Sequence, residues 1–323
     1  MKNIDLGWGN PYFLLSELSK SYKPSVGSDL EPFLMSYGSD AGEPELIKKV
    51  DEITKNLNGF GYKYYIITNG ATQALNSCIR VLSRNAITDQ VNMDYLGYPF
   101  MDGIIEKNNM CKVSVDFDSE RTAICSNHVV VIDSPSNPLG RQYQGYINPY
   151  TVWDAVYHNP IYGAEINKQP EHAVYINSFS KLLGTTGLRV GWIGTNSPAL
   201  YDKILNDTLM ENATTSKLSQ HKILDILKVI DLDLFIKNGK SLLEANKENL
   251  NKINKIMGID APEIGMFYCA KADKKLFDLF DKANITYVKI KYKNDDMIRL
   301  NIGQTYGIIK QAVKNIKKID GGK

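Results

Sequence analysis

Lys181 is the residue whose type and surroundings best suit covalent chemistry. It lies in the segment NSFSKLLGTTGLR, residues 177–189, directly after a predicted strand and among serines and glycines. A partly desolvated lysine amine forms Schiff bases with carbonyl compounds, because burial disfavours its ammonium form. Ser178 and Arg189 are both able to hold an anion nearby. A lysine after a serine is more commonly a solvated surface residue, so the segment alone is weak evidence.

The spacing of Ser178 and Lys181 also fits the Ser-x-x-Lys motif of serine β-lactamases and penicillin-binding proteins. That chemistry requires Ser-Asp-Asn and Lys-Thr-Gly elements further along the chain. Neither string occurs in the sequence, so we set this interpretation aside.

A candidate phosphate site is the segment TNGATQAL, residues 68–75, between a predicted strand and a predicted helix. Small residues such as Gly70 and Ala71 let a phosphate approach backbone N–H groups at a helix N-terminus, where the helix dipole also favours an anion. The alternative is an ordinary helix cap at Asn69 or Thr72. For this segment taken alone, the cap is the better interpretation.

Two further polar segments follow apolar runs. The turn SPSNPLG, residues 134–140, presents Asn137 directly after the run HVVVID, where ligands bind in open α/β sheets. Asp154 and Tyr157 follow another short strand. Their functional interpretation is that they bind a pyridine ring that carries a phenolic oxygen. Asp154 would form an ion pair with the protonated ring nitrogen, and Tyr157 and Asn137 would form hydrogen bonds with the phenolic oxygen. The alternatives are an Asn-Pro turn, a capping aspartate and a core tyrosine.

A sheet must bring these strand ends together. Strands are predicted at 62–68, 90–94, 128–133, 151–153, 173–177 and 190–194, and helices alternate with them at 71–82 and 99–107. Such alternation is typical of a mostly parallel sheet with helices on both faces. We therefore predict an α/β fold with a large domain over residues 38–235.

The chain becomes mainly helical after Pro198, with a long amphipathic pattern at 240–255. Beyond it, strands are predicted at 266–270, 286–291 and 297–302, with helices at 274–283 and 308–316. We predict a smaller α+β domain formed by residues 1–37 and 236–323.

Charge and composition exclude several kinds of partner. The 38 basic and 36 acidic residues leave a net charge of +2, which gives no electrostatic footprint for nucleic acid or an anionic membrane. The N-terminus lacks the apolar run of a signal peptide, and no stretch approaches a membrane span. The four cysteines and four histidines show no metal-ligand spacing, so we predict no metal site. We expect a soluble cytoplasmic protein.

These segments, in this order, resemble the class I/II aminotransferases of pyridoxal-phosphate (PLP) fold type I. The matching strings are Tyr37-Gly38 with Gly42 and Leu46, Gly70-Ala71-Thr72-Gln73, Leu96-Gly97-Tyr98-Pro99, Pro135-Ser136-Asn137-Pro138-Leu139-Gly140, Asp154-Ala155-Val156-Tyr157, and Ser178-Phe179-Ser180-Lys181 with Arg189. Each string is weak, but the ordered set is specific, because independent short matches multiply. Leu96 departs from the family, which usually has a proline there.

The resemblance implies a catalytic role for Lys181, which would form the Schiff base with pyridoxal 5′-phosphate and shuttle protons. Asp154 would keep the pyridine nitrogen protonated, so that the ring acts as an electron sink. Asn137 and Tyr157 would bind the ring hydroxyl, and Tyr98 would stack on the ring face.

The resemblance also implies binding roles. The phosphate would be held by Gly70, Ala71, Thr72, Ser178 and Arg189. Tyr37 would reach the phosphate of the neighbouring subunit, so the family's homodimer would share its active sites. Arg299, together with Asn137, would bind the substrate, with the arginine clamping its α-carboxylate bidentately. For Arg299 the alternative is a surface residue on an edge strand.

We therefore expect an aminotransferase that moves an amino group between an α-amino acid and a 2-oxo acid. The segment WDAVYHNPIY, residues 153–162, is also similar to the alliinase and tryptophan-aminotransferase branch, which includes C–S lyases. A PLP-dependent lyase or decarboxylase on the same scaffold is the alternative. A non-enzymatic regulator or scaffold is disfavoured, because a decayed site has no need of Lys181, Asp154 and Arg189 together.

Overall fold

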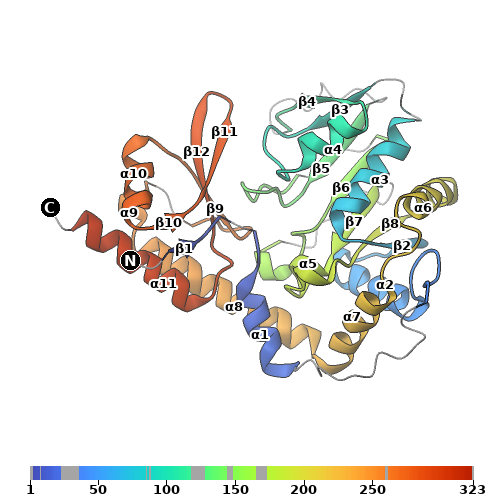
Figure 1. Cartoon of the computed structure of the whole chain (residues 1–323), viewed down its shortest axis with the longest axis horizontal. Coiled ribbons are helices and arrows are strands. Elements are labelled where there is room, and N and C mark those ends of the chain that lie inside the picture. Colours follow the sequence, from blue (N-terminus) through green and yellow to red (C-terminus); the bar gives the residue numbers. More distant parts are fainter. Residues whose placement is uncertain are drawn as a thin grey trace.

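The computed structural model describes residues 3–7, 9–22, 36–84, 86, 89–117, 128–143, 148–164, 173–258 and 261–321. Its elements gather around a seven-stranded sheet and a three-stranded sheet (Figure 1). Within these residues, none of the helices combines the length and the apolar character needed to cross a membrane.

The large sheet has the strand order β2-β8-β7-β6-β5-β3-β4. Its strands are β2 (Tyr64–Thr68), β3 (Gln90–Met93), β4 (Cys111–Ser114), β5 (Val129–Asp133), β6 (Thr151–Asp154), β7 (Val174–Ser178) and β8 (Gly191–Thr195). β8 runs antiparallel to β2 and β7, and the remaining neighbours are parallel. The predicted mostly parallel sheet is confirmed, and the carboxyl ends of β5, β6 and β7 lie side by side.

Side chains of β6 and β7 alternate between two apolar cores, because successive residues of a strand point to opposite faces. Trp153 and Tyr175 pack in the core that contains α2 (Pro44–Asn58). Val152 and Val174 pack in the core that contains α3 (Ala71–Ser83), α4 (Met101–Lys107) and part of α6 (Pro198–Asn212). Helices therefore cover both faces, as predicted.

Local sequence signals fix where the helices begin. The Ser197 side chain accepts a hydrogen bond of 3.3 Å from the Leu200 N–H, and Pro198 occupies the first turn of α6, where its missing N–H costs nothing. The Asp231 carboxylate caps α8 (Leu232–Asn251) in the same way, by accepting from the Leu234 N–H at 3.0 Å. α7 (Lys217–Val229) lies between these two helices in the chain.

The second group of elements surrounds the antiparallel sheet β11-β12-β9. It contains β9 (Phe267–Lys271), β11 (Val288–Tyr292), β12 (Asp295–Asn301), α1 (Tyr12–Ser21), α9 (Asn254–Met257), α10 (Lys274–Lys282) and α11 (Tyr306–Asp320). β1 (Ile4–Asp5) pairs in parallel with β10 (Ile285–Thr286), so the N-terminal segment lies among C-terminal elements. The long helix α8 packs against α1, α11 and the 3-10 helix η2 (Pro160–Tyr162), and so joins the two groups.

The single strand predicted at 286–291 is wrong in detail. Ile285 and Thr286 pair with β1, whereas Val288 to Tyr292 pair with β12. The chain changes its pairing partner at Tyr287, and an apolar pattern alone does not report that change.

The tip of the β11–β12 hairpin reaches the large sheet. Lys293 Nζ lies 3.2 Å from Asp116 Oδ2, and the Tyr292 ring meets the Tyr95 ring edge to face with centroids 6.1 Å apart. Arg141 Nη2 donates to the Tyr292 hydroxyl at 3.4 Å. The two groups of elements are therefore in contact through the tip of this hairpin.

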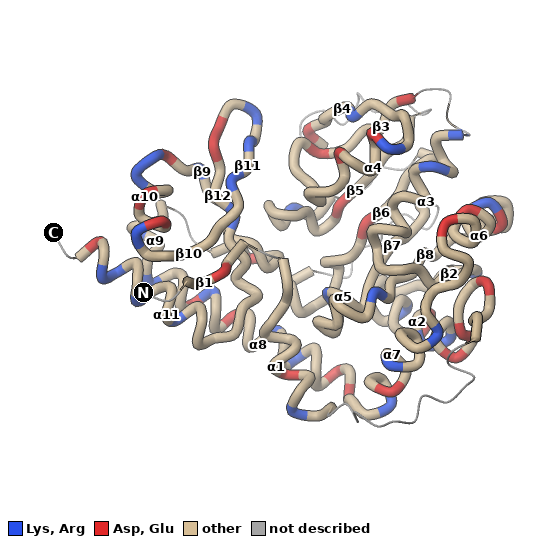
Figure 2. Tube along the Cα trace, in the orientation of Figure 1, with Lys and Arg blue, Asp and Glu red and all other residues tan. Residues whose placement is uncertain are grey.

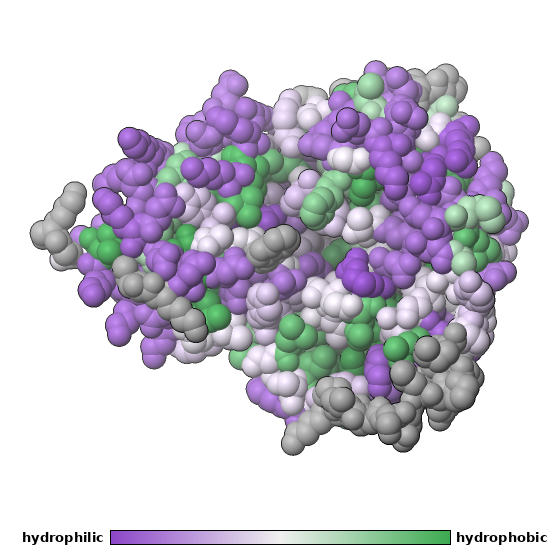
Figure 3. Space-filling model, in the orientation of Figure 1, coloured by the Kyte–Doolittle hydropathy of each residue, from purple (hydrophilic) through white to green (hydrophobic). Residues whose placement is uncertain are grey.

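Lys and Arg residues are interspersed with Asp and Glu residues along the chain, as the trace in Figure 2 shows. Hydrophilic residues cover most of the face seen in Figure 3, and apolar residues form small patches on it. Most buried apolar side chains are instead gathered in two large cores, and a third, smaller cluster contains Val130 and Ile132 of β5.

Gly191 of β8 permits a close backbone approach that orders the turn before α3. A Cβ at this position would lie 2.7 Å from the Gly70 carbonyl carbon and 2.8 Å from the Ala71 nitrogen. We predict that Gly191→Ala lowers the free energy of unfolding by about 1–3 kcal/mol, as overpacking does. Urea denaturation measures the change.

Gly103→Ala is the matched control, because Gly103 lies in α4 and a Cβ there meets nothing within 4 Å. It should stabilise the protein by up to about 1 kcal/mol, since glycine weakens a helix. Equal denaturation midpoints for Gly191→Ala and the unaltered protein would contradict the prediction.

Candidate active site

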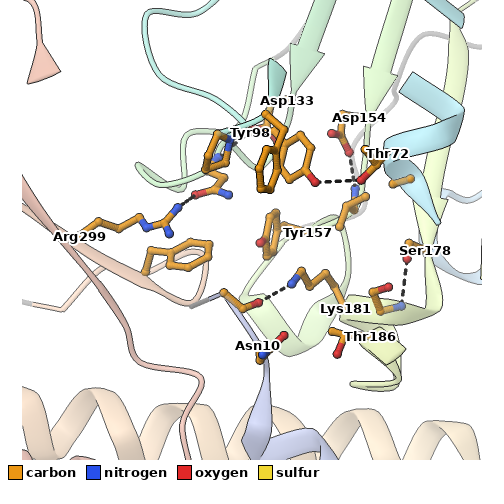
Figure 4. Close-up of a pocket in the computed structure, with 18 of the residues that line it drawn as sticks. Asn10, Thr72, Tyr98, Asp133, Asp154, Tyr157, Ser178, Lys181, Thr186 and Arg299 are labelled. Carbon is orange, nitrogen blue, oxygen red and sulfur yellow. Dashed lines mark hydrogen bonds between the residues drawn. The ribbon is translucent and has the colours of Figure 1, made fainter. Parts of the chain in front are cut away.

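A cavity of about 660 Å³ lies at the carboxyl ends of β5, β6 and β7 and is bordered by β12 and the N-terminal segment (Figure 4). Its lining includes Gly9, Asn10, Ala71, Thr72, Tyr98, Asp133, Asn137, Asp154, Tyr157, Ser178, Lys181, Arg189, Phe267 and Arg299. The fold thus brings into one cavity almost every side chain that the sequence singled out.

Lys181 enters the cavity from the short helix α5 (Phe179–Leu182), which begins directly after β7. Its backbone carbonyl accepts from the Tyr162 hydroxyl at 2.7 Å, and its Nζ donates to the Gly9 carbonyl. Burial, followed by the nearby Arg299 and Arg189 charges, lowers the pKa of the Lys181 amine to about 8. A larger share of this amine is therefore neutral and nucleophilic near pH 7 than for an ordinary lysine.

The N-terminus of α3 and Arg189 together form a candidate anion-binding site. Gly70, with a φ of 76°, is the N-cap of α3 and makes no side-chain cap hydrogen bond, and Ala71 and Thr72 of the first turn line the cavity. Arg189 Nη2 donates to the Asn69 carbonyl at 3.3 Å. A Cβ on Gly70 would lie 2.4 Å from that same nitrogen, and the positive φ strains any other residue type at this position. Backbone donors, the helix dipole and a cation converge here, which suits a phosphate.

Asp154 ends β6 and is 5% exposed. Its Oδ1 accepts from the Val156 N–H at 3.2 Å, and burial raises its pKa to about 6. Asp154 and Lys181 lie on different sides of the cavity (Figure 4). An anion held there is placed to pair with a protonated group on a ring bound between them.

Arg299 approaches from β12 and is 6% exposed, so the surface alternative is wrong. Its Nη1 donates to Asn137 Oδ1 at 3.3 Å, and its Nη2 donates to the Gly7 carbonyl at 3.2 Å. Its Nε has no hydrogen-bond partner among the described residues. The guanidinium also stacks 4.6 Å from the Phe267 ring centroid. A buried cation with neutral partners and a spare donor is ready for a carboxylate.

Tyr98 and Tyr157 supply the aromatic surfaces of the cavity. Tyr98 shares a hydrogen bond of 2.8 Å with Thr72 Oγ1. Tyr157 meets the rings of Tyr162 and Phe267 edge to face, at centroid distances of 5.5 and 5.7 Å. Burial raises the pKa of the Tyr157 phenol well above its ordinary value, so the hydroxyl is a hydrogen-bond donor at neutral pH.

Tyr37 stands apart from the cavity, since its side chain is 82% exposed. This position neither tests nor contradicts its expected contact with a second subunit. The cavity lining also includes residues to which the sequence did not point, among them Gly9, Phe267 and Asp133. Asp133 had a signal that was overlooked, because it is the charged last residue of the apolar run at 128–133.

Comparisons with known proteins place this fold. The family model described as "Allinase" matches residues 34–257. Tryptophan aminotransferase-related protein 2 of Arabidopsis thaliana is 23% identical over 226 residues, which are 65% of this chain and 50% of that protein. The (5-formylfuran-3-yl)methyl phosphate transaminase of Methanocaldococcus jannaschii is 25% identical over 312 residues, or 87% of this chain and 82% of that enzyme. The chain spans about half the length of the plant relatives.

A solved structure from Methanococcus jannaschii, described as similar in its active site to kynurenine aminotransferases, superposes with a TM-score of 0.79 at 21% identity. The superposition covers 98% of this chain and 92% of that one. The fold is therefore that of the aminotransferases of PLP fold type I, as the sequence predicted.

The lowered pKa of Lys181 gives a testable pH dependence. Attachment of pyridoxal 5′-phosphate needs the neutral amine, so its rate should rise with pH and level off above about pH 8 rather than near 10.4, the ordinary lysine value. Stopped-flow absorbance after mixing the cofactor with cofactor-free protein measures the rate.

Borohydride reduction and peptide mass spectrometry should then find the label on Lys181. Lys271→Arg is the control, because Lys271 is an exposed lysine of β9 and its loss should leave the profile unchanged. A label on another lysine, or a rate still rising tenfold per pH unit above pH 9, would refute the assignment.

Proposed function

This chain belongs to the allinase family, and from that membership and the cavity's geometry we propose that it is a pyridoxal-phosphate-dependent aminotransferase. The proposed reaction moves an amino group between an α-amino acid and a 2-oxo acid. The observation that carries the proposal is the convergence of Lys181, Asp154 and Arg299 on one cavity. These are an amine, an acid and a cation, each buried beyond what its type favours.

The residues present fit the cofactor. The uncapped start of α3, the space left by Gly70 and the Arg189 guanidinium suit a phosphate. Asp154 would face the ring nitrogen, Asn137 and Tyr157 the ring hydroxyl, and Tyr98 the ring face. Thr72 and Ser178 would complete the phosphate contacts with Ala71. When bound, pyridoxal phosphate supplies an aldehyde that condenses with amines and a ring that withdraws electrons.

Arg299 would bind the substrate's α-carboxylate, with its spare Nε as the first donor. Held at that end, the substrate would have its Cα–H bond near Lys181 Nζ. Lys181 Nζ would then take the proton from Cα as a general base and later give it up as a general acid. The pKa of its amine, about 8, suits both roles near neutral pH. Phe267 and Tyr157 would exclude water from the same space.

A lyase is the second candidate, because the alliin lyase of Allium cepa var. aggregatum is 28% identical to this chain over 114 residues, or 35% of the chain. The same residues would remove the same Cα proton, and a leaving group on the substrate's side chain would then depart. The choice between the two reactions therefore rests on the substrate rather than on Lys181 or Asp154.

A half-reaction without an acceptor separates these candidates. We predict that holoenzyme mixed with an α-amino acid yields one equivalent of 2-oxo acid per site and then stops until a 2-oxo acid is added. Keto acid, ammonia and carbon dioxide are assayed separately over a panel of amino acids. Sustained release of ammonia, a thiol or carbon dioxide with no acceptor present would establish a lyase or a decarboxylase instead.

We also propose a homodimer in which Tyr37 of each subunit serves the other subunit's site. This proposal is motivated by the position of Tyr37, which is 82% exposed and lies outside the cavity of its own subunit. Tyr37→Ala and Lys181→Ala should each lose cofactor-dependent activity. Mixed and re-associated subunits should recover about one quarter of the native sites, because half of the random dimers are hybrids with one complete site each.

Light scattering should show a dimer at micromolar concentration for the native chain and for both variants. A fully active monomer, or a mixture of variants that recovers no activity while hybrids form, would contradict the shared site.

A further inference from the structure

Asp133 places a second carboxyl group beside Asp154. β5 and β6 pair in parallel with Asp133 directly opposite Asp154, and both residues end their strands. Register neighbours of a parallel pair point to the same face, with backbones about 4.8 Å apart. Both side chains line the central cavity, and they are 8% and 5% exposed. Two acids therefore stand together in a space that excludes most water.

Each of the two carboxyl groups has little to compensate a charge. Asp133 Oδ2 accepts from the Asn137 N–H at 2.9 Å, and Asp154 Oδ1 accepts from the Val156 N–H at 3.2 Å. Across the described ranges, neither carboxyl takes part in an ion pair with a lysine or arginine. A buried carboxylate with a single N–H partner is costly, and two adjacent ones also repel each other.

The groups packed around the pair do not supply the missing positive charge. Asp94, which follows the neighbouring strand β3, accepts a hydrogen bond from the Tyr143 hydroxyl, and the Arg141 charge acts to lower the pKa of its carboxyl group. From β12, Arg299 donates to Asn137 rather than to either acid, and Lys181 donates to Gly9. The remaining neighbour, Tyr157, is a phenol held neutral by burial.

Burial, and then the Asp154 and Asp94 charges, raise the pKa of Asp133 well above its ordinary range. For Asp154 burial is the main cause of the raised pKa. Asp133 thus has two acidic neighbours, whereas Asp154 has one, and the proton belongs on Asp133.

We propose that Asp133 and Asp154 share one proton, carried mainly by Asp133, so that the pair presents a single negative charge to the cavity. Asp133 is then a positioning residue: it gives Asp154 a neutral neighbour and lets that carboxylate remain ionised where the ring nitrogen of the proposed cofactor would lie. Only this last step rests on the proposed function. The shared proton is a property of the chain itself.

The test is an infrared titration of the full-length chain, in which the carbonyl stretch of protonated carboxylic acids is followed from pH 4 to pH 9. Asp133→Asn keeps the size and the acceptor for the Asn137 N–H. The difference spectrum against the native chain should show a protonated acid that persists at pH 7 and is lost in the variant. Asp102→Asn, on the exposed side of α4, is the control and should lose no such band.

The decisive measurement is the pKa of each acid after the other acid has been replaced. In Asp154→Asn the pKa of Asp133 should fall by about one unit or more, and in Asp133→Asn the pKa of Asp154 should fall likewise, because coupled groups titrate as a pair. An unchanged pKa of the remaining acid, or no protonated acid at pH 7 in the native chain, would overturn the proposal. The native titration and the Asp154→Asn arm decide the question even if Asp133→Asn fails to fold.

Addition of pyridoxal 5′-phosphate separates this inference from the proposed function. The Asp133 band should survive saturation with the cofactor, whereas any protonated Asp154 should lose its proton to the ring nitrogen. Disappearance of the Asp133 band on binding would overturn the positioning role. Failure of the cofactor to attach to Lys181 would refute the proposed function and leave the titration of the cofactor-free chain intact.

Discussion

Burial of charge is the constraint on which the central cavity depends. Asp133, Asp154 and Arg299 are all nearly inaccessible to water, and Lys181 is lowered in pKa by the same burial. A charge inside protein must be paired, neutralised or held for a ligand that pairs it. The molecule uses all three solutions. Asp94 is paired through a hydrogen bond from Tyr143, and Asp133 is placed to keep a proton and so to be neutral. Arg299 has only neutral partners, which leaves its charge for a ligand.

The sheet makes this concentration of charge possible. Parallel strands end at one edge, so Asp133 pairs with Asp154 and Asp154 with Ile176, although more than forty positions separate Asp133 from Ile176 in the chain. Behind that edge, Trp153, Tyr175 and Trp192 are fully buried and anchor the strands. Rigid strand ends allow a costly arrangement of polar groups to persist, because moving one of them would disturb close-packed side chains.

Much of this arrangement could be predicted from the sequence, and the parts that could not have a common cause. The apolar runs of β5 and β7 and the polar turns after them report local chemistry, so Lys181, Asn137 and Asp154 were found. The edge strand β4 was missed, because its side chains are half-buried and its apolar pattern is correspondingly weak. Gly9 and Phe267 enter the site through contacts between distant segments, and no local pattern encodes those contacts. The change of partner at Tyr287 is of the same kind. Asp133 did have a local signal, as the charged last residue of an apolar run.

Arg299 is a buried cation whose hydrogen-bond partners leave its charge uncompensated. Its Nη atoms bond to the Asn137 side chain and the Gly7 carbonyl, which are neutral acceptors on different elements. A carboxylate that reaches the spare Nε gains a charge-assisted hydrogen bond and relieves a buried cation, whereas an amide or an alcohol of the same shape gains only a neutral bond. Because Asn137 also donates its backbone N–H to Asp133, one turn connects the cation to the acid pair. The turn at 134–140, which contains two prolines and a glycine, therefore links Arg299 to Asp133 through Asn137.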